Sequence, residues 1–145
     1  MVVLSSLLDL AGFYLPHFQI ASEKSIEIAD EDEGMIVRGE IDVLTIFNQL
    51  WILVIESKKT TFSLEVGQPQ LLAYMLANPN QKKPVYGMIS NGNSFIFIKL
   101  IQQDTPRYAL SRLFYILNPG NDLYQILRVL KCLGRLAINN TNLSE

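Results

Sequence analysis

Three charged side chains at the margins of two apolar segments have the residue types that metal-assisted phosphate chemistry requires. Asp42 precedes the first segment, and Glu56 and Lys58 follow the second, with a polar Asn48-Gln49 between the two. Burying an unpaired charge beside apolar surface is costly, so these carboxylates need a compensating partner. Mg²⁺ typically binds one or two carboxylates and keeps several waters, which leaves room for a phosphate oxygen. A lysine on the same face can then orient an attacking water or stabilise charge in the transition state.

The distance between the two carboxylates depends on how the apolar segments pair. If both are strands and the loop centres on residue 49, positions whose numbers sum to 98 lie opposite each other, and Asp42 faces Glu56. A two-residue loop changes that sum to 97 and turns the carboxylates to opposite faces of the sheet. A shared cation therefore requires a loop with an odd number of residues or a β-bulge. The other interpretation is that the charges mark strand ends in solvent, where Glu56 and Lys58 form a weak surface pair.

The segments around these charges predict a sheet flanked by helices. Helical patterns with capping residues or a first-turn proline cover residues 5–10, 63–77 and 121–133. Strand patterns cover residues 18–29, 41–47 and 50–57, two strands around Asn91-Gly92 within residues 84–100, and residues 107–113. Gly134 is expected to end the last helix, and residues 139–145 are expected to form a frayed tail. This order of elements describes a central sheet between helices.

Length and composition describe one compact domain and limit its chemistry. The chain has 145 residues, of which 49% are hydrophobic, and we expect a single domain over residues 1–138. Its apolar runs are too short to span a bilayer and its N-terminus lacks the basic segment of a signal peptide, so we expect no membrane association. A single Cys132 fits a reducing cytoplasm, and the only histidine, His17, excludes paired-histidine and Cys/His metal sites within one chain.

Charge is unevenly distributed along the chain. Residues 1–42 contain nine acids and two bases, whereas residues 43–145 contain five acids and ten bases. The acidic run at residues 30–33 is interpreted as a solvated turn. The basic excess in the second part suits a phosphate backbone, but a pI near 5.4 argues against strong non-specific nucleic-acid binding by this chain alone.

A second motif follows the carboxylates and gives the pattern a family resemblance. Gln70 and Tyr74 lie one helical turn apart, on the same face of the predicted helix. Together with Asp42 and Glu56-Ser57-Lys58 they resemble the PD-(D/E)xK nuclease superfamily, and in particular the N-terminal nuclease domain of type I restriction enzyme R subunits. The resemblance covers residues 20–99. It implies a restriction-endonuclease-like α/β fold, with three α/β/α layers and a central mixed sheet.

The resemblance also implies a function. A metal-dependent nuclease would hydrolyse DNA phosphodiester bonds, with Asp42 and Glu56 as ligands of Mg²⁺, for which Mn²⁺ can substitute. Lys58 would activate water, and Gln70 would hold the site or the substrate. The alternative is a nuclease-fold protein that does not cut and serves as a nucleic-acid-binding or partner subunit; the intact Asp-Glu-Lys set favours the enzyme. The expected partners are DNA and either a second copy in a two-fold homodimer or a motor or specificity subunit.

Some acidic residues have no assigned role. Members of the superfamily often place a further acid on the first helix, where this chain offers only Asp9. Glu23 and Glu27 lie in a predicted strand, and the resemblance makes neither of them a ligand. The roles of Glu40 and Tyr74 are likewise left open.

Overall fold

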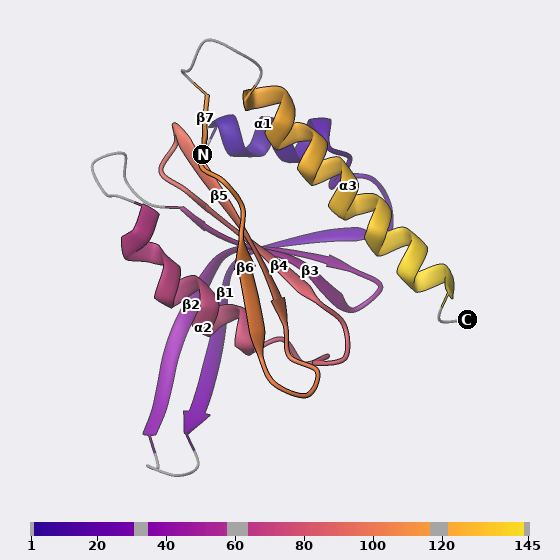
Figure 1. The fold of residues 1–145 in the computed structure, drawn as a ribbon. Coiled ribbons are helices and arrows are strands. Elements are labelled where there is room, and N and C mark those ends of the chain that lie inside the picture. Colours follow the sequence, from indigo (N-terminus) through magenta and orange to yellow (C-terminus); the bar gives the residue numbers. More distant parts are fainter. Residues whose placement is uncertain (1, 31–34, 58–63, 117–121, 144–145) are drawn as a thin grey trace.

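A mixed sheet with helices on both faces organises the chain (Figure 1). The computed structural model describes residues 2–30, 35–57, 64–116 and 122–143. The helices are α1 (Val2–Leu10), a single 3-10 turn η1 (Leu64–Gly67), α2 (Gln68–Leu76) and α3 (Asp122–Leu143). The strands are β1 (Phe18–Asp30), β2 (Met35–Phe47), β3 (Leu50–Ser57), β4 (Val85–Ser90), β5 (Ser94–Ile101), β6 (Arg107–Leu110) and β7 (Phe114–Tyr115). The expected sheet between helices is therefore confirmed.

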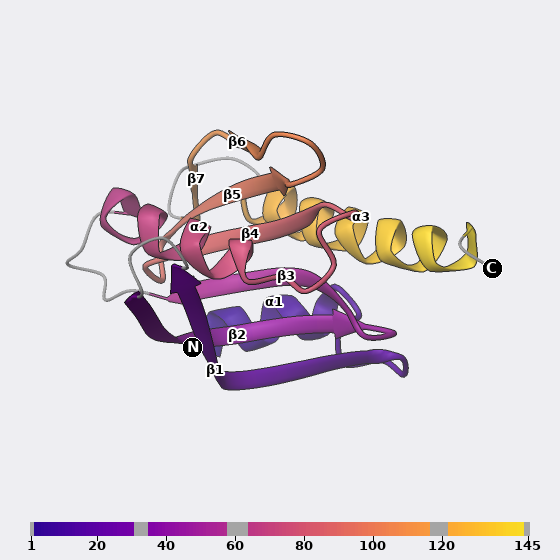
Figure 2. The same cartoon turned by 90° about the horizontal axis from the view of Figure 1, so that it is seen from below.

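The strands follow one another across the sheet in the order β1-β2-β3-β4-β5-β6, and β7 pairs with β5 (Figure 2). Only the pairing of β3 with β4 is parallel among the described strands, which makes the sheet mixed. A parallel pair needs a crossover connection, and α2 lies in that connection. β1 and β2 extend together beyond the other strands, because β2 begins at Met35 rather than near residue 41.

Two apolar cores lie on the two faces of the sheet. One contains side chains of α1 and α3, and the other contains side chains of α2. Figure 1 shows α1 and α3 on one side of the sheet and α2 on the other. Most strand residues alternate between the two cores, as the period of two predicts. Ile55 lies in the α1/α3 core, for example, and the preceding Val54 lies in the α2 core. No helix within the described ranges has the length and apolar character needed to cross a membrane.

The last helix is longer than the sequence predicts. α3 continues through Gly134 to Leu143, so most of the predicted tail at residues 139–145 belongs to a helix. Gly134 is buried, and a Cβ there would lie 3.7 Å from the ring of Phe13 and 3.8 Å from that of Phe18. Ala137, one turn further on, is 5% exposed and lies in the same core. This tertiary packing outweighs the tendency of glycine to end a helix.

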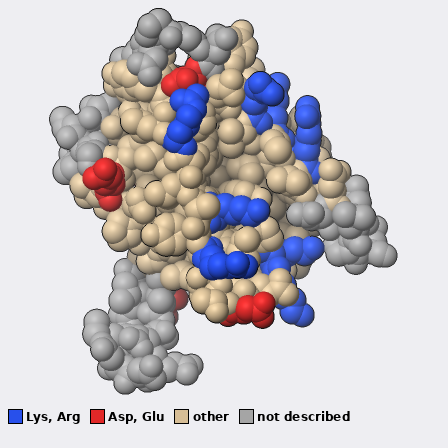
Figure 3. Space-filling model, in the orientation of Figure 1, with Lys and Arg blue, Asp and Glu red and all other residues tan. Residues whose placement is uncertain are grey.

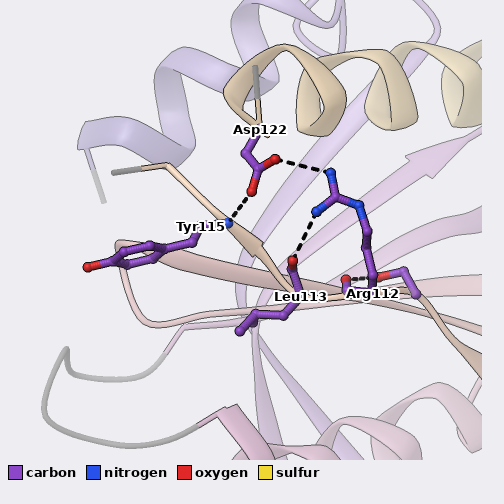
Figure 4. A network of polar contacts seen from close by, with 5 residues as sticks. Arg112, Leu113, Tyr115 and Asp122 are labelled. Atoms are coloured by element: carbon purple, nitrogen blue, oxygen red, sulfur yellow. Dashed lines mark hydrogen bonds and ion pairs between the residues drawn. The ribbon is translucent and has the colours of Figure 1, made fainter. Parts of the chain in front are cut away.

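A polar network fixes the start of α3 (Figure 4). Asp122 accepts hydrogen bonds from the Arg112 guanidinium at 3.1 Å and from the backbone N–H of Tyr115 at 2.9 Å. Arg112 also donates to the carbonyl oxygen of Leu113 at 3.2 Å and lies over the ring of Phe114. The network connects the helix to the segment that contains β6 and β7.

Candidate active site

The pairing of β2 with β3 decides whether the two carboxylates can meet. Asn48 and Gln49 form a two-residue turn with φ values of 49° and 68°, which suits the twist of a hairpin. Next to the turn, the residue numbers of paired positions sum to 97. Beyond a β-bulge at Thr45/Ile46 the numbers sum to 98, and Val43 pairs with Ile55. Val43–Ile55 is the last pair formed, and one further step of that register would place Asp42 opposite Glu56. The bulge that a shared cation requires is therefore present.

Asp42 and Glu56 lie at the end of this hairpin that is far from the turn. Alternation along β3 places Glu56 on the same face as Val54, which is the face covered by α2. Glu56 is 2% exposed, and Asp42 is half-buried. The backbone N–H of Ser57 donates to Asp42 Oδ2 at 2.9 Å. This hydrogen bond joins Asp42 directly to the strand end that carries Glu56.

Two carboxylates on adjoining strand ends are a donor set that fits a hard divalent cation. Oxygen is the preferred ligand of Mg²⁺, and two carboxylates leave positions for waters and a phosphate oxygen. In the described part of the chain, no group of three or more His, Cys, Asp or Glu side chains could hold a metal ion, so the candidate donor set consists of these two. Lys58 lies outside the described residues, and its place beside the carboxylates stays a prediction.

The acidic residues of β1 and β2 that had no assigned role do not enlarge this donor set. Register places Glu23 opposite Asp42, but Glu23 has a φ of 55° and is exposed. A left-handed backbone turns a side chain away from the regular alternation of a strand. Glu27 and Glu40 are also exposed. None of them joins Asp42 and Glu56 as a third ligand.

The Gln70–Tyr74 pair connects α2 to β2. Gln70 Nε2 donates to the Tyr74 hydroxyl at 2.6 Å, and the backbone N–H of Glu40 lies 3.4 Å from the same oxygen. Tyr74 is 7% exposed, whereas Gln70 is exposed. The motif therefore holds the helix against the strand that carries Asp42. The residue pattern also predicts that Gln70 reaches toward Lys58 or Glu56. Lys58 lies outside the described ranges, and this approach stays a prediction.

Gly39 is a site residue that the sequence analysis missed. A Cβ at this position would lie 2.5 Å from Tyr74 Cε1 and 2.9 Å from the Tyr74 hydroxyl oxygen. Only glycine allows the ring to approach the strand so closely. A glycine inside a strand, here between Arg38 and Glu40, is the signal that could have indicated this approach.

Gly39→Ala is expected to displace Tyr74 and to lower the free energy of unfolding by about 1–3 kcal/mol, because overpacking forces side chains from their rotamers. Chemical denaturation measures the change. The matched control is Gly39→Ala in a Tyr74→Leu background, where the ring that would clash is absent. There, Gly39→Ala should lower the free energy of unfolding by less than it does in the wild type. A Gly39→Ala variant as stable as the wild type would show that the ring does not depend on this glycine.

Comparison with protein families identifies the domain. Residues 7–105, more than half of the chain, match the model of the type I restriction enzyme R protein N terminus. The chain belongs to this family. The matched span includes Asp42, Glu56, Gln70 and Tyr74. The family expected from the residue pattern is thereby confirmed, and a search of curated proteins gave no match.

A solved structure shows the same fold as this R-protein N-terminal domain. The fragment structure of a putative HsdR subunit of a type I restriction enzyme from Vibrio vulnificus YJ016 matches 89% of this chain with a TM-score of 0.50. The sequence identity is 14%, so the likeness concerns the fold alone. The fold is the restriction-endonuclease-like α/β architecture expected from the sequence. The match covers 24% of the solved HsdR chain, so this domain spans about a quarter of that chain's length.

Proposed function

We propose that this domain is a metal-dependent nuclease that hydrolyses DNA phosphodiester bonds at Asp42 and Glu56. The observation that carries the proposal is the β-bulge, since the register beyond it, extended one step past the Val43–Ile55 pair, would bring the two carboxylates opposite each other. The burial of Glu56 and the hydrogen bond from Ser57 to Asp42 support it, because they hold the carboxylates on a rigid hairpin. Membership of the type I restriction R-protein family supports DNA as the substrate.

Each residue has a distinct role in the proposed reaction. Asp42 and Glu56 would hold Mg²⁺, which supplies charge stabilisation on a phosphate oxygen and lowers the pKa of a bound water. Lys58 would orient the attacking water and stabilise the negative charge that develops on the phosphate. Tyr74 positions Gln70 on α2, where the Gln70 amide would hold the site or the substrate.

The proposed partners follow from the same family. A type I restriction assembly supports contact with a motor or specificity subunit, and the two strands of a duplex support a two-fold homodimer. Sedimentation at tens of micromolar protein separates these two proposals, because a homodimer would form without any other subunit.

Incubation of the purified domain with supercoiled plasmid DNA and Mg²⁺ or Mn²⁺ tests the proposal. We expect nicked and linear products with metal, and none when a chelator is present. DNA binding without any cleavage under these conditions would overturn the nuclease proposal. It would favour the alternative in which the domain does not cut and serves as a nucleic-acid-binding subunit.

A further inference from the structure

Lysine and arginine side chains are concentrated on the face of the domain that β4–β6 and α3 form. Residues 80–135 contain eight bases and two acids. Figure 3 shows the basic side chains gathered on this face with few acidic ones among them. Six of these bases define the basic patch: Lys82, Lys83, Lys99, Arg107, Arg128 and Arg135.

The basic patch is assembled from four neighbouring parts of the fold. Its two adjacent lysines precede β4, Arg107 begins β6, and the other two arginines lie two turns apart on α3. Lys99 on β5 lies opposite Tyr86 on β4, with its Nζ 5.9 Å from the centre of the Tyr86 ring. Lys99 also lines a hollow together with Val129 and Leu133 of α3. Lys83 lines a second hollow that also includes Leu133, so the strand lysines lie beside α3, and Figure 3 shows the basic side chains gathered on this face.

The cations of the patch have no carboxylate partners within the described part of the chain. Five of the six are exposed, and Lys83 is half-buried. Of the two acids in residues 80–135, Asp122 is paired with Arg112, which leaves Asp104 alone to offset the patch. Uncompensated like charges on one surface repel each other and attract an anionic partner. Nine of the fourteen acids that make the pI of the whole chain acidic lie in residues 1–42, outside the segments that form the patch.

We infer that the basic patch binds the phosphate backbone of DNA at a place separate from the two carboxylates. Lys99 lies on the α3 face of the sheet, whereas Glu56 lies on the α2 face. The sheet thus separates the patch from the candidate active site, so the patch holds a different segment of DNA from the one that would be cut. The inference rests on the proposed function only in taking DNA as the substrate.

Charge also distinguishes between occupants of the patch. A second copy that met this face through two-fold symmetry would bring the same cations together, which is unfavourable. An acidic protein surface would be attracted to the patch, but the cations are spread over a broad exposed surface rather than around one pocket. Phosphates that recur along a duplex suit such a surface, since each neutralised phosphate adds to the affinity through counterion release.

Fluorescence anisotropy with a labelled DNA duplex, in chelator and at several salt concentrations, tests the inference without cleavage. The triple variant Lys99→Gln, Arg107→Gln and Arg128→Gln removes three exposed cations. We expect it to bind at least about tenfold more weakly at low salt, with a shallower dependence of affinity on salt, because it loses phosphate contacts. Unchanged binding by the triple variant would overturn the inference, provided that its thermal unfolding matches the wild type.

Single variants provide the matched control. Lys99→Gln and Gln19→Glu each lower the net charge by one at an exposed position, but Gln19 lies on β1, at the opposite edge of the sheet. Only Lys99→Gln should weaken binding, and equal weakening by both would overturn the inference. If the wild-type protein binds DNA but does not cleave it with metal, the nuclease proposal is refuted, whereas DNA binding by the basic patch is still supported. Absence of DNA binding at low salt would overturn the inference. It would favour the other occupant considered above, an acidic protein surface.

Discussion

Asp42→Asn is expected to abolish metal-dependent cleavage of DNA while the domain stays folded. The remaining carboxylate, Glu56, cannot by itself hold Mg²⁺ against the strong hydration of that ion. The asparagine side-chain oxygen still offers an acceptor to the Ser57 N–H, which lies 2.9 Å from Asp42 Oδ2. Without metal, the free energy of unfolding should therefore stay within about 1 kcal/mol of the wild-type value. Plasmid nicking and chemical denaturation measure the two effects.

Glu56→Gln and Asp42→Ala are the matched variants for this result. Glu56→Gln should also abolish cleavage, and the apo domain should be as stable as the wild type or more stable, because repulsion between facing carboxylates is relieved. Asp42→Ala removes the acceptor of the Ser57 N–H and should cost about 1–3 kcal/mol for that reason alone. If the charges serve only as structural ion pairs, removing either charge would destabilise the domain and neither change would alter the response to metal.

Lys58→Ala is expected to retain the response to Mg²⁺ and to lose about 10²–10³-fold in the rate of cleavage, because its proposed role is in the transition state. The expectation rests on the sequence position of Lys58, two residues after Glu56 and hence on the same side of an extended chain. Single-turnover cleavage and metal-dependent thermal unfolding measure the rate and the metal response separately.

The neighbouring lysine is a control for this variant. Lys59 is adjacent in sequence and has the same charge, but it would point the other way in an extended chain. Lys59→Ala should therefore cleave at a rate close to that of the wild type. Equal losses from both substitutions would show that the lysines act as general positive charge rather than as one positioned group.

The sequence predicts that a shared metal site requires an odd loop or a β-bulge, but it does not show that a bulge is present. The turn at Asn48-Gln49 is polar and recognisable, whereas residues 50–55 are all apolar, so no polar marker identifies a bulged residue. In the structure Ile52 and Leu53 both lie in the α1/α3 core, which interrupts the alternation of β3. Extended one step beyond the Val43–Ile55 pair, this change of register would bring Asp42 opposite Glu56.

Contacts between distant segments explain the other differences. The spacing of Gln70 and Tyr74 predicts a shared helix face, but not that the tyrosine ring needs Gly39, which is 35 positions earlier. Gly134 has the local signal of a helix end, yet packing near Phe13 keeps it inside α3. Local patterns therefore predicted the elements, while long-range packing determined their bounds and the register.

Thermal unfolding of the wild-type domain during a Mg²⁺ titration tests most directly whether Asp42 and Glu56 form a metal site. A ligand that binds only the folded state, at a concentration ten times its Kd, stabilises that state by about 1.4 kcal/mol. In a domain of this size, that gain should raise the Tm by roughly 3–6 °C. We predict such a rise for the wild type and none for Asp42→Asn or Glu56→Gln. A wild-type Tm that neither Mg²⁺ nor Mn²⁺ changes, or an equal rise in all three proteins, would contradict the proposed site.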